Sequence, residues 1–169
     1  PISGVMVNDR IHDAMIEQSK KIGTFAHGFT YSAHPVCAAV AVRTLELMEE
    51  RRILEHVREV MPVMQRRLRK LGDHPLVGDV RGAGLVGAVE LVAEKTTKRA
   101  FDPKKMVGAN CAEFAVKHGL ITRAMTDSLG FCPPLVITEA EINEMFDRFE
   151  KALDDTEHWV TKEGLRKAA

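Results

Sequence analysis

Apolar side chains recur every three or four positions along five stretches of the chain, which is the spacing of an amphipathic helix. The stretches are residues 9–20, 35–51, 53–71, 104–118 and 139–153. Pro62 falls inside the third and is expected to kink or split that helix, because its ring removes a backbone donor. Thr138 and Glu141 form a capping-box pattern ahead of the last helix, and the tail from Trp159 is expected to be frayed.

Short apolar runs between these helices predict β-strands. The runs cover residues 2–7, 76–80, 85–92, 120–124 and 131–136. The glycines of residues 81–84 permit a tight connection between two of them. Helices and strands alternate, which predicts an α/β fold, specifically an α+β domain whose small sheet is covered on one side by helices. We expect residues 35–169 to form this domain with a long linking helix, and residues 1–34 to be a remnant of another domain.

A loop at residues 23–35 contains Gly23 and Gly28 and carries hydroxyl, imidazole and aromatic groups to the start of the second predicted helix. Loops that carry polar groups to a helix N-terminus commonly hold ligands, especially anions. Pro35 suits the first position of that helix, where a missing backbone donor is tolerated. We therefore interpret residues 23–35 as a binding loop.

The composition limits the classes of function. The chain has 169 residues, 45% of them apolar, which is enough for a core of its own. Lys plus Arg (24) balances Asp plus Glu (24), so no general attraction to nucleic acid or to an anionic membrane is expected. Three cysteines without CxxC spacing support neither a disulfide framework nor a zinc site, and they fit a cytoplasmic protein. No apolar run approaches the length of a membrane span.

The end of the binding loop, His27 to Pro35 (HGFTYSAHP), resembles the corresponding loop of class III pyridoxal-phosphate-dependent aminotransferases of fold type I, which usually have glycine at the position of Ala33. The resemblance is strongest to the branch that transfers amino groups from ω-amino acids or amines to pyruvate. Further similar segments follow in the family's order: residues 1–3 (PIS), 80–85 (VRGAGL), 122–123 (TR) and 133–135 (PPL). The resemblance covers essentially the whole chain and implies the C-terminal part of such an enzyme.

The resemblance assigns roles to three residues. Thr30 matches the threonine that reaches across a dimer interface to the phosphate of pyridoxal 5'-phosphate bound by the other subunit, with Phe29 beside it. On chemistry alone, the Thr30 hydroxyl could instead make a local turn or capping contact. Arg123 matches the arginine that binds the substrate carboxylate and swings away from substrates without one. An arginine at a strand end otherwise reaches solvent or pairs with an acid such as Asp127.

The resemblance further implies a homodimeric transaminase that uses an amino donor and a keto acid acceptor. The family's Schiff-base lysine lies just upstream of the segment that matches residues 1–3. We therefore assign no catalytic residue, and we expect the chain to be a C-terminal fragment that is inactive by itself. Two alternatives stay open: a complete small protein, and a non-catalytic module that dimerises or binds a phosphate.

Other candidate sites are weaker. Residues 82–87 match GxGxxG, but the strand that follows offers no helix N-terminus to a pyrophosphate, so a turn between strands is expected, with Arg81 as a structural hydrogen-bonding residue. The arginines of residues 51–52 and 66–70 are interleaved with glutamates, which predicts a solvent-exposed helix face that carries several ion pairs. None of the seven histidines has a second ligand at metal-site spacing. The nucleophile elbow of a hydrolase is not present in the sequence.

Overall fold

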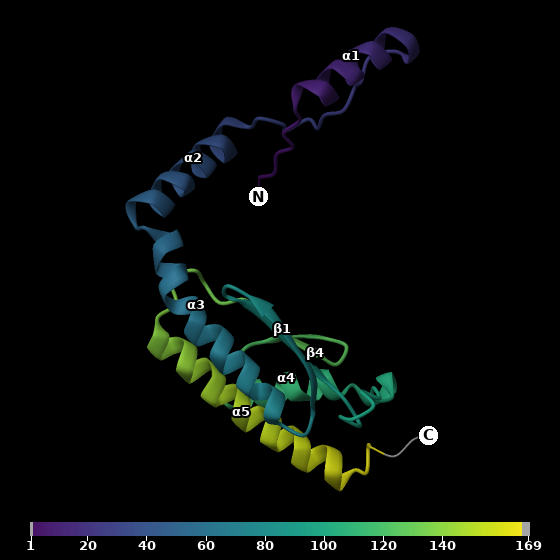
Figure 1. Cartoon of the computed structure of the whole chain (residues 1–169), viewed down its shortest axis with the longest axis vertical. Coiled ribbons are helices and arrows are strands. Elements are labelled where there is room, and N and C mark those ends of the chain that lie inside the picture. Colours follow the sequence, from purple (N-terminus) through teal and green to yellow (C-terminus); the bar gives the residue numbers. More distant parts are fainter. Residues whose placement is uncertain (1, 167–169) are drawn as a thin grey trace. The chain divides into compact units, whose positions relative to one another are not determined.

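The computed structural model describes residues 2–166, which fall into two compact units, Pro1–Arg51 and Arg52–Ala169 (Figure 1). The first unit contains helices α1 (Asp9–Ile22) and α2 (Pro35–Glu50). None of the described residues of this unit is buried. The hydrophobic core of the described chain therefore lies in the second unit, to which every buried residue belongs.

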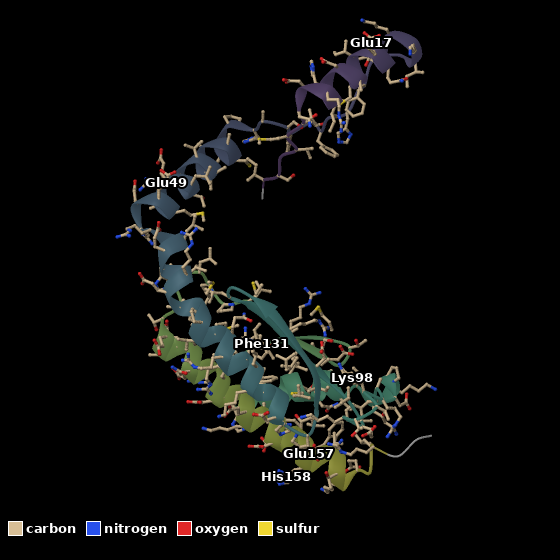
Figure 2. All side chains as sticks on the ribbon, viewed as in Figure 1. Glu17, Glu49, Lys98, Phe131, Glu157 and His158 are labelled. Carbon is tan, nitrogen blue, oxygen red and sulfur yellow. The ribbon has the colours of Figure 1, made fainter. Side chains whose placement is uncertain are left out.

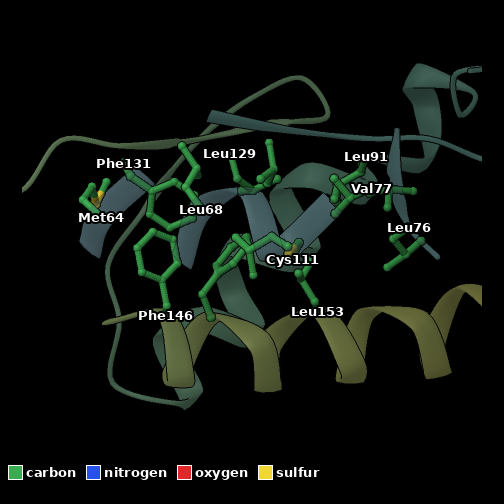
Figure 3. Close-up of a cluster of buried hydrophobic side chains, with 14 of the residues drawn as sticks. Met64, Leu68, Leu76, Val77, Leu91, Cys111, Leu129, Phe131, Phe146 and Leu153 are labelled. Carbon is green, nitrogen blue, oxygen red and sulfur yellow. The ribbon is translucent and has the colours of Figure 1, made fainter. Parts of the chain in front are cut away.

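The second unit is a small sheet packed on helices. Its elements are α3 (Ile53–Lys70), a 3-10 turn (Leu71–Asp73), β1 (Val77–Ala83), β2 (Val86–Leu91), a second 3-10 turn (Pro103–Lys105), α4 (Val107–Lys117), β3 (Arg123–Met125), β4 (Ser128–Phe131) and α5 (Glu139–Lys162). All strands of the sheet are antiparallel, in the order β1-β2-β4-β3. Figure 3 shows the sheet on one side of the core and α5 on the other. The predicted mixed α/β fold with a small sheet is confirmed.

Helix α5 supplies the largest part of the core. Thr138 and Glu141 form the predicted capping box, in which the Thr138 hydroxyl accepts from the Glu141 backbone N–H at 3.3 Å. The rings of Phe146 and Phe149 lie 5.3 and 4.8 Å from that of Phe131 on β4. Such aromatic pairs contribute roughly 0.5–1.5 kcal/mol beyond their buried area. Figure 2 shows Phe131 pointing into this interior.

The glycine-rich segment at residues 82–87 is a turn between antiparallel strands, as predicted. Ala83 pairs with Val86, so Gly84 and Leu85 form a two-residue loop between β1 and β2. Gly84 has a φ of +57°, which an L-residue adopts at a cost. The Arg81 guanidinium bonds Asp79 at 2.8 Å and Glu90 at 3.0 Å, which is a structural role within the sheet.

Two predicted strands are wrong. Residues 2–7 form no strand, since no partner strand lies beside them within residues 2–166. The run at residues 131–136 is mostly a loop, and the strand is β4, which ends at Phe131. Pro133 and Pro134 explain this end, because proline has no N–H to donate to a neighbouring strand.

Two helices continue further than predicted. Helix α3 is not split at Pro62, which is exposed and lies inside a continuous helix of 18 residues. Helix α5 continues through Trp159 to Lys162, because Val160 is fully buried and Trp159 packs against the core.

The ion pairs of the basic segment at residues 66–70 also differ from the prediction. Arg67 bonds Asp147 at 2.6 Å and Asn143 at 3.1 Å on α5, so its guanidinium joins two helices. Lys70 likewise reaches Glu150 at 3.5 Å. The basic segment therefore holds α3 to α5, instead of pairing with glutamates of its own helix.

Candidate functional site

The binding loop lies in the first unit, between α1 and α2. Asn8 caps α1 by accepting from the Ile11 N–H at 3.1 Å, and Gly23 ends this helix with a φ of +100°. Helix α2 has Pro35 at its first position, as predicted, and His34 makes no side-chain capping bond to it. The first backbone donors of α2 are thus left without a side-chain cap from the residue that precedes them.

A tight turn at Phe29–Ser32 displays the predicted cofactor-binding residues. The Ser32 N–H donates to the Phe29 carbonyl at 2.9 Å, and the Phe29 N–H donates to the Ser32 hydroxyl at 3.1 Å. Ser32 therefore makes the local turn contact that was the alternative role of Thr30. The Thr30 hydroxyl forms no hydrogen bond with another described residue, and Thr30 is exposed. Its hydroxyl is available to a ligand.

Ala33 follows this turn with a φ of +56°, in the left-handed region. An L-residue pays roughly 1–2 kcal/mol for that conformation, and glycine pays little. This backbone geometry favours glycine, the residue that the resemblance implies at this position. The His34 N–H donates to the Tyr31 carbonyl at 3.2 Å and continues the turn into α2.

Rings order the rest of the loop. His27 lies between Phe25 and Phe29, with centroid distances of 6.0 and 5.4 Å, and Tyr31 lies 5.9 Å from His34. The side chains of His27 and His34 make no hydrogen bond with another described residue, so their rings order the loop by contacts with aromatic neighbours. A hollow of about 500 Å³ beside the turn is lined by Phe29, Tyr31, Ser32, Ala33, His34 and neighbouring residues of the first unit.

Arg123, the predicted substrate-binding residue, lies in the second unit at the start of the edge strand β3. It pairs with Gly130 of β4, and the neighbouring Thr122 hydroxyl donates to the Gly130 carbonyl at 2.7 Å. Arg123 is exposed and forms no side-chain hydrogen bond or ion pair with another described residue. Its guanidinium is therefore free to bind a carboxylate.

The suggested alternative partner of Arg123, Asp127, is engaged elsewhere. Its Oδ1 accepts from the Gly108 N–H of α4 at 2.9 Å, and its carbonyl accepts from the Leu91 N–H at 2.8 Å. Burial raises the pKa of Asp127, the Gly108 hydrogen bond lowers it and the nearby Glu90 charge raises it. Sequence reasoning missed the capping roles of Ser32 and Asp127, whose only sequence signal is that both residue types favour turns.

Neither a metal centre nor a membrane span emerges from the part of the chain that the structure describes. No three or more His, Cys, Asp or Glu side chains among residues 2–166 gather as metal ligands. No helix within the same range has the length and apolar character required to cross a bilayer. The described residues offer an exposed hydroxyl at Thr30 and an arginine, Arg123, without a side-chain partner among them.

Comparison with known proteins gives one consistent result. The family model "Aminotransferase class-III" matches residues 1–153. The chain is 45% identical over 157 residues to putrescine–pyruvate aminotransferase of Pseudomonas aeruginosa, covering 92% of this chain and 33% of that protein. It is 39% identical over 160 residues to the chloroplastic gamma aminobutyrate transaminase 3 of Solanum lycopersicum, covering 95% and 31%. The chain spans about a third of the length of these relatives.

Solved structures agree with the sequence comparisons. The omega transaminase of Pseudomonas jessenii in complex with PMP matches with a TM-score of 0.82 and 41% identity, over 92% of this chain and 34% of that chain. A transaminase solved with L-alanine matches with a TM-score of 0.83 and 44% identity, over 91% and 36%. The fold, the binding loop and the family model therefore lead to the same conclusion: this chain belongs to the class III aminotransferase family.

Proposed function

We propose that this chain supplies cofactor- and substrate-binding residues to an enzyme that moves an amino group from an ω-amino acid or amine to a keto acid such as pyruvate. The family match supports an aminotransferase. The two named relatives, one acting on putrescine and pyruvate and one on gamma-aminobutyrate, support this choice of donor and acceptor. The domain division into residues 1–34 and 35–169, with α2 as the link, stays part of the proposal.

The observation that carries the proposal is the Phe29–Ser32 turn. A phosphate requires hydrogen-bond donors that are not already used by the protein, and the Thr30 hydroxyl at this exposed turn meets the requirement. The described residues thus fit the phosphate of pyridoxal 5'-phosphate. When bound, this group carries the amino group between substrates and acts as an electron sink. Phe29 would hold Thr30 in place through its two bonds to Ser32.

Arg123 is proposed to select substrates. A guanidinium makes two parallel hydrogen bonds to a carboxylate, and this one has no competing partner among the described residues. It would orient the carboxylate of pyruvate or of an amino acid. An amino donor without a carboxylate gains nothing from these two hydrogen bonds. The Arg123 side chain would then stay in solvent while such a donor is bound.

We also propose a homodimer in which Thr30 reaches the phosphate held by the other subunit. The surface of the first unit supports an interface, because an apolar hollow of about 470 Å³ on α2 is lined by Val36, Val40, Leu45 and neighbouring residues. Val36 and Val40 are 64% and 62% exposed. Exposed apolar surface of this kind is typical of sites that another protein surface covers. The three free cysteines support a cytoplasmic location.

The proposed role of Thr30 is tested in the full-length enzyme with Thr30→Ala, using Thr30→Ser as the matched control that keeps the hydroxyl. A hydrogen bond to a charged phosphate contributes about 1.5–3 kcal/mol, so Thr30→Ala is expected to weaken cofactor binding by roughly tenfold to a hundredfold. Equilibrium dialysis measures this affinity. If Thr30 were only a turn residue, the melting temperature of the apo enzyme would fall while cofactor affinity stayed level.

The 169-residue chain alone is expected to show no turnover. All described lysines are exposed, whereas a nucleophilic lysine is activated in a desolvated pocket or beside another cation. Mixing the purified chain with pyridoxal 5'-phosphate should therefore give no stoichiometric change of cofactor absorbance and no product. Turnover by this chain would contradict the assignment of the catalytic lysine to another part of the enzyme.

A further inference from the structure

The β3–β4 hairpin carries Arg123, and its turn is seated directly on the N-terminus of α4. The turn consists of Thr126 and Asp127, between the paired residues Met125 and Ser128. A Cβ added to Gly108 would lie 2.8 Å from the Asp127 Cα and would also collide with the Thr126 carbonyl oxygen. Only glycine allows this approach, so the backbone of the hairpin and that of α4 are in contact.

Asp127 provides the bond that fixes this contact. The residue before α4, Met106, has a φ of +51° and makes no side-chain capping bond to its own helix. The Asp127 carboxylate takes over this function from another element, through its 2.9 Å bond to the Gly108 N–H. A negative charge at a helix N-terminus is favourable, which adds to the strength of the bond.

A cavity of about 490 Å³ adjoins the hairpin turn and the start of α4. It is lined by Phe101, Met106, Ala124, Thr126, Asp127 and neighbouring residues. The Leu91 N–H also holds the turn, through its 2.8 Å bond to the Asp127 carbonyl, so loss of the carboxylate bond leaves the turn anchored on the β2 side alone with the cavity beside it. Among the described residues β3 pairs with β4 alone, so a shift of the turn is expected to reach Arg123, which lies four residues before Asp127.

We propose that Asp127 is a positioning residue for binding of the substrate carboxylate. It holds the β3–β4 hairpin against α4 and thereby sets the position of Arg123. This inference rests on the proposed role of Arg123 and adds the residue that sets its position. Asp127 does not contact the substrate in this scheme. Its loss displaces the guanidinium fork, and bidentate binding of a carboxylate tolerates little displacement.

The test uses the full-length enzyme with Asp127→Ala, which removes the acceptor, and Asp127→Asn, whose amide oxygen still accepts from the Gly108 N–H. The readouts are kcat/KM for pyruvate and for putrescine, a donor without a carboxylate. We expect Asp127→Ala to lower kcat/KM for pyruvate by about tenfold, the effect of one lost hydrogen bond. The value for putrescine should change by less than about twofold, and Asp127→Asn should behave as wild type within about threefold.

Coupling to Arg123 completes the test. In an Arg123→Ala background, Asp127→Ala should cause no further loss for pyruvate, because the group it positions is gone. Equal losses for both substrates in Asp127→Ala, or an additive loss in the double variant, would overturn the positioning role alone. If Arg123→Ala lowers kcat/KM equally for pyruvate and putrescine, the substrate role of Arg123 and this inference are both overturned. If Asp127→Ala does not fold, Asp127→Glu, which lengthens the side chain, serves for the same comparison.

Discussion

Ser32 and Phe29 hold each other through two hydrogen bonds that run in opposite directions, 2.9 Å from the Ser32 N–H and 3.1 Å to the Ser32 hydroxyl. This pair closes the turn without using the Thr30 side chain. The turn nevertheless contains one unfavourable residue, Ala33 at a φ of +56°. The binding loop is therefore not optimised for stability, and its strain is measurable.

Ala33→Gly in the full-length enzyme is expected to raise the free energy of unfolding by about 1 kcal/mol. The left-handed conformation is costly for alanine, and the higher chain entropy of glycine in the unfolded state offsets only part of the gain. Urea denaturation of the apo enzyme measures the difference. The matched control is Ala38→Gly in the interior of α2, which should lower the same quantity by about 1 kcal/mol. A loss of stability in both variants would show that the turn carries no strain.

Arg123→Lys is expected to lower kcat/KM for pyruvate by at least about tenfold, because an ammonium group cannot reproduce two parallel bonds to a carboxylate. The putrescine half-reaction should stay within about twofold, since this donor has no carboxylate. Single-turnover kinetics of the two half-reactions give both values. The control is Arg69→Lys, an exposed arginine on α3. Equal losses for both substrates would mean that Arg123 supports the fold instead of the substrate.

The capping box of α5 is expected to make stability depend on pH. The Thr138 backbone N–H and hydroxyl, which both bond the Glu141 carboxylate, hold its pKa below the ordinary 4.5. A lowered pKa stabilises the folded chain above that ordinary value, and the contribution is lost as the pH falls through the folded pKa. Wild type should therefore exceed Glu141→Gln in stability at pH 7, and the difference should vanish in acid.

Urea titrations of both proteins between pH 7 and pH 2 measure this dependence. Glu113→Gln on α4, also exposed, is the control and should show little difference at any pH. Thr138→Ala removes the cap itself and should cost about 1 kcal/mol at neutral pH. A pH-independent difference between wild type and Glu141→Gln would contradict the role of the carboxylate charge.

Most of the helices could be predicted from the sequence, because their apolar spacing and caps are local signals. Helices α1, α2 and α3 begin at Asp9, Pro35 and Ile53 as expected. The β3–β4 hairpin could not be placed correctly. The apolar content of residues 131–136 suggested a strand, whereas the missing N–H groups of Pro133 and Pro134 end it at Phe131.

The site was predictable as a list of residues but not as a geometry. Resemblance to a family pointed to Thr30 and Arg123. At Ser32 and Ala33 the sequence offered only the turn preference of serine and the glycine usual in that family, and neither specifies the bonds of Ser32 or the φ of Ala33. The bond between Asp127 and Gly108 joins residues 19 positions apart in sequence. Such a contact depends on the packing of α4 against the hairpin, which no periodic pattern encodes.

The strand order β1-β2-β4-β3 leaves β1 and β3 as the two edges of the sheet. Exposed edges can recruit strands from other molecules, and short edge strands with charged side chains resist this. Strand β3 has three residues and begins with Arg123, while β1 carries Asp79 and Arg81. The charge of Arg123 therefore also disfavours edge-to-edge pairing of the sheet. An apolar substitution at this position is expected to make such association easier.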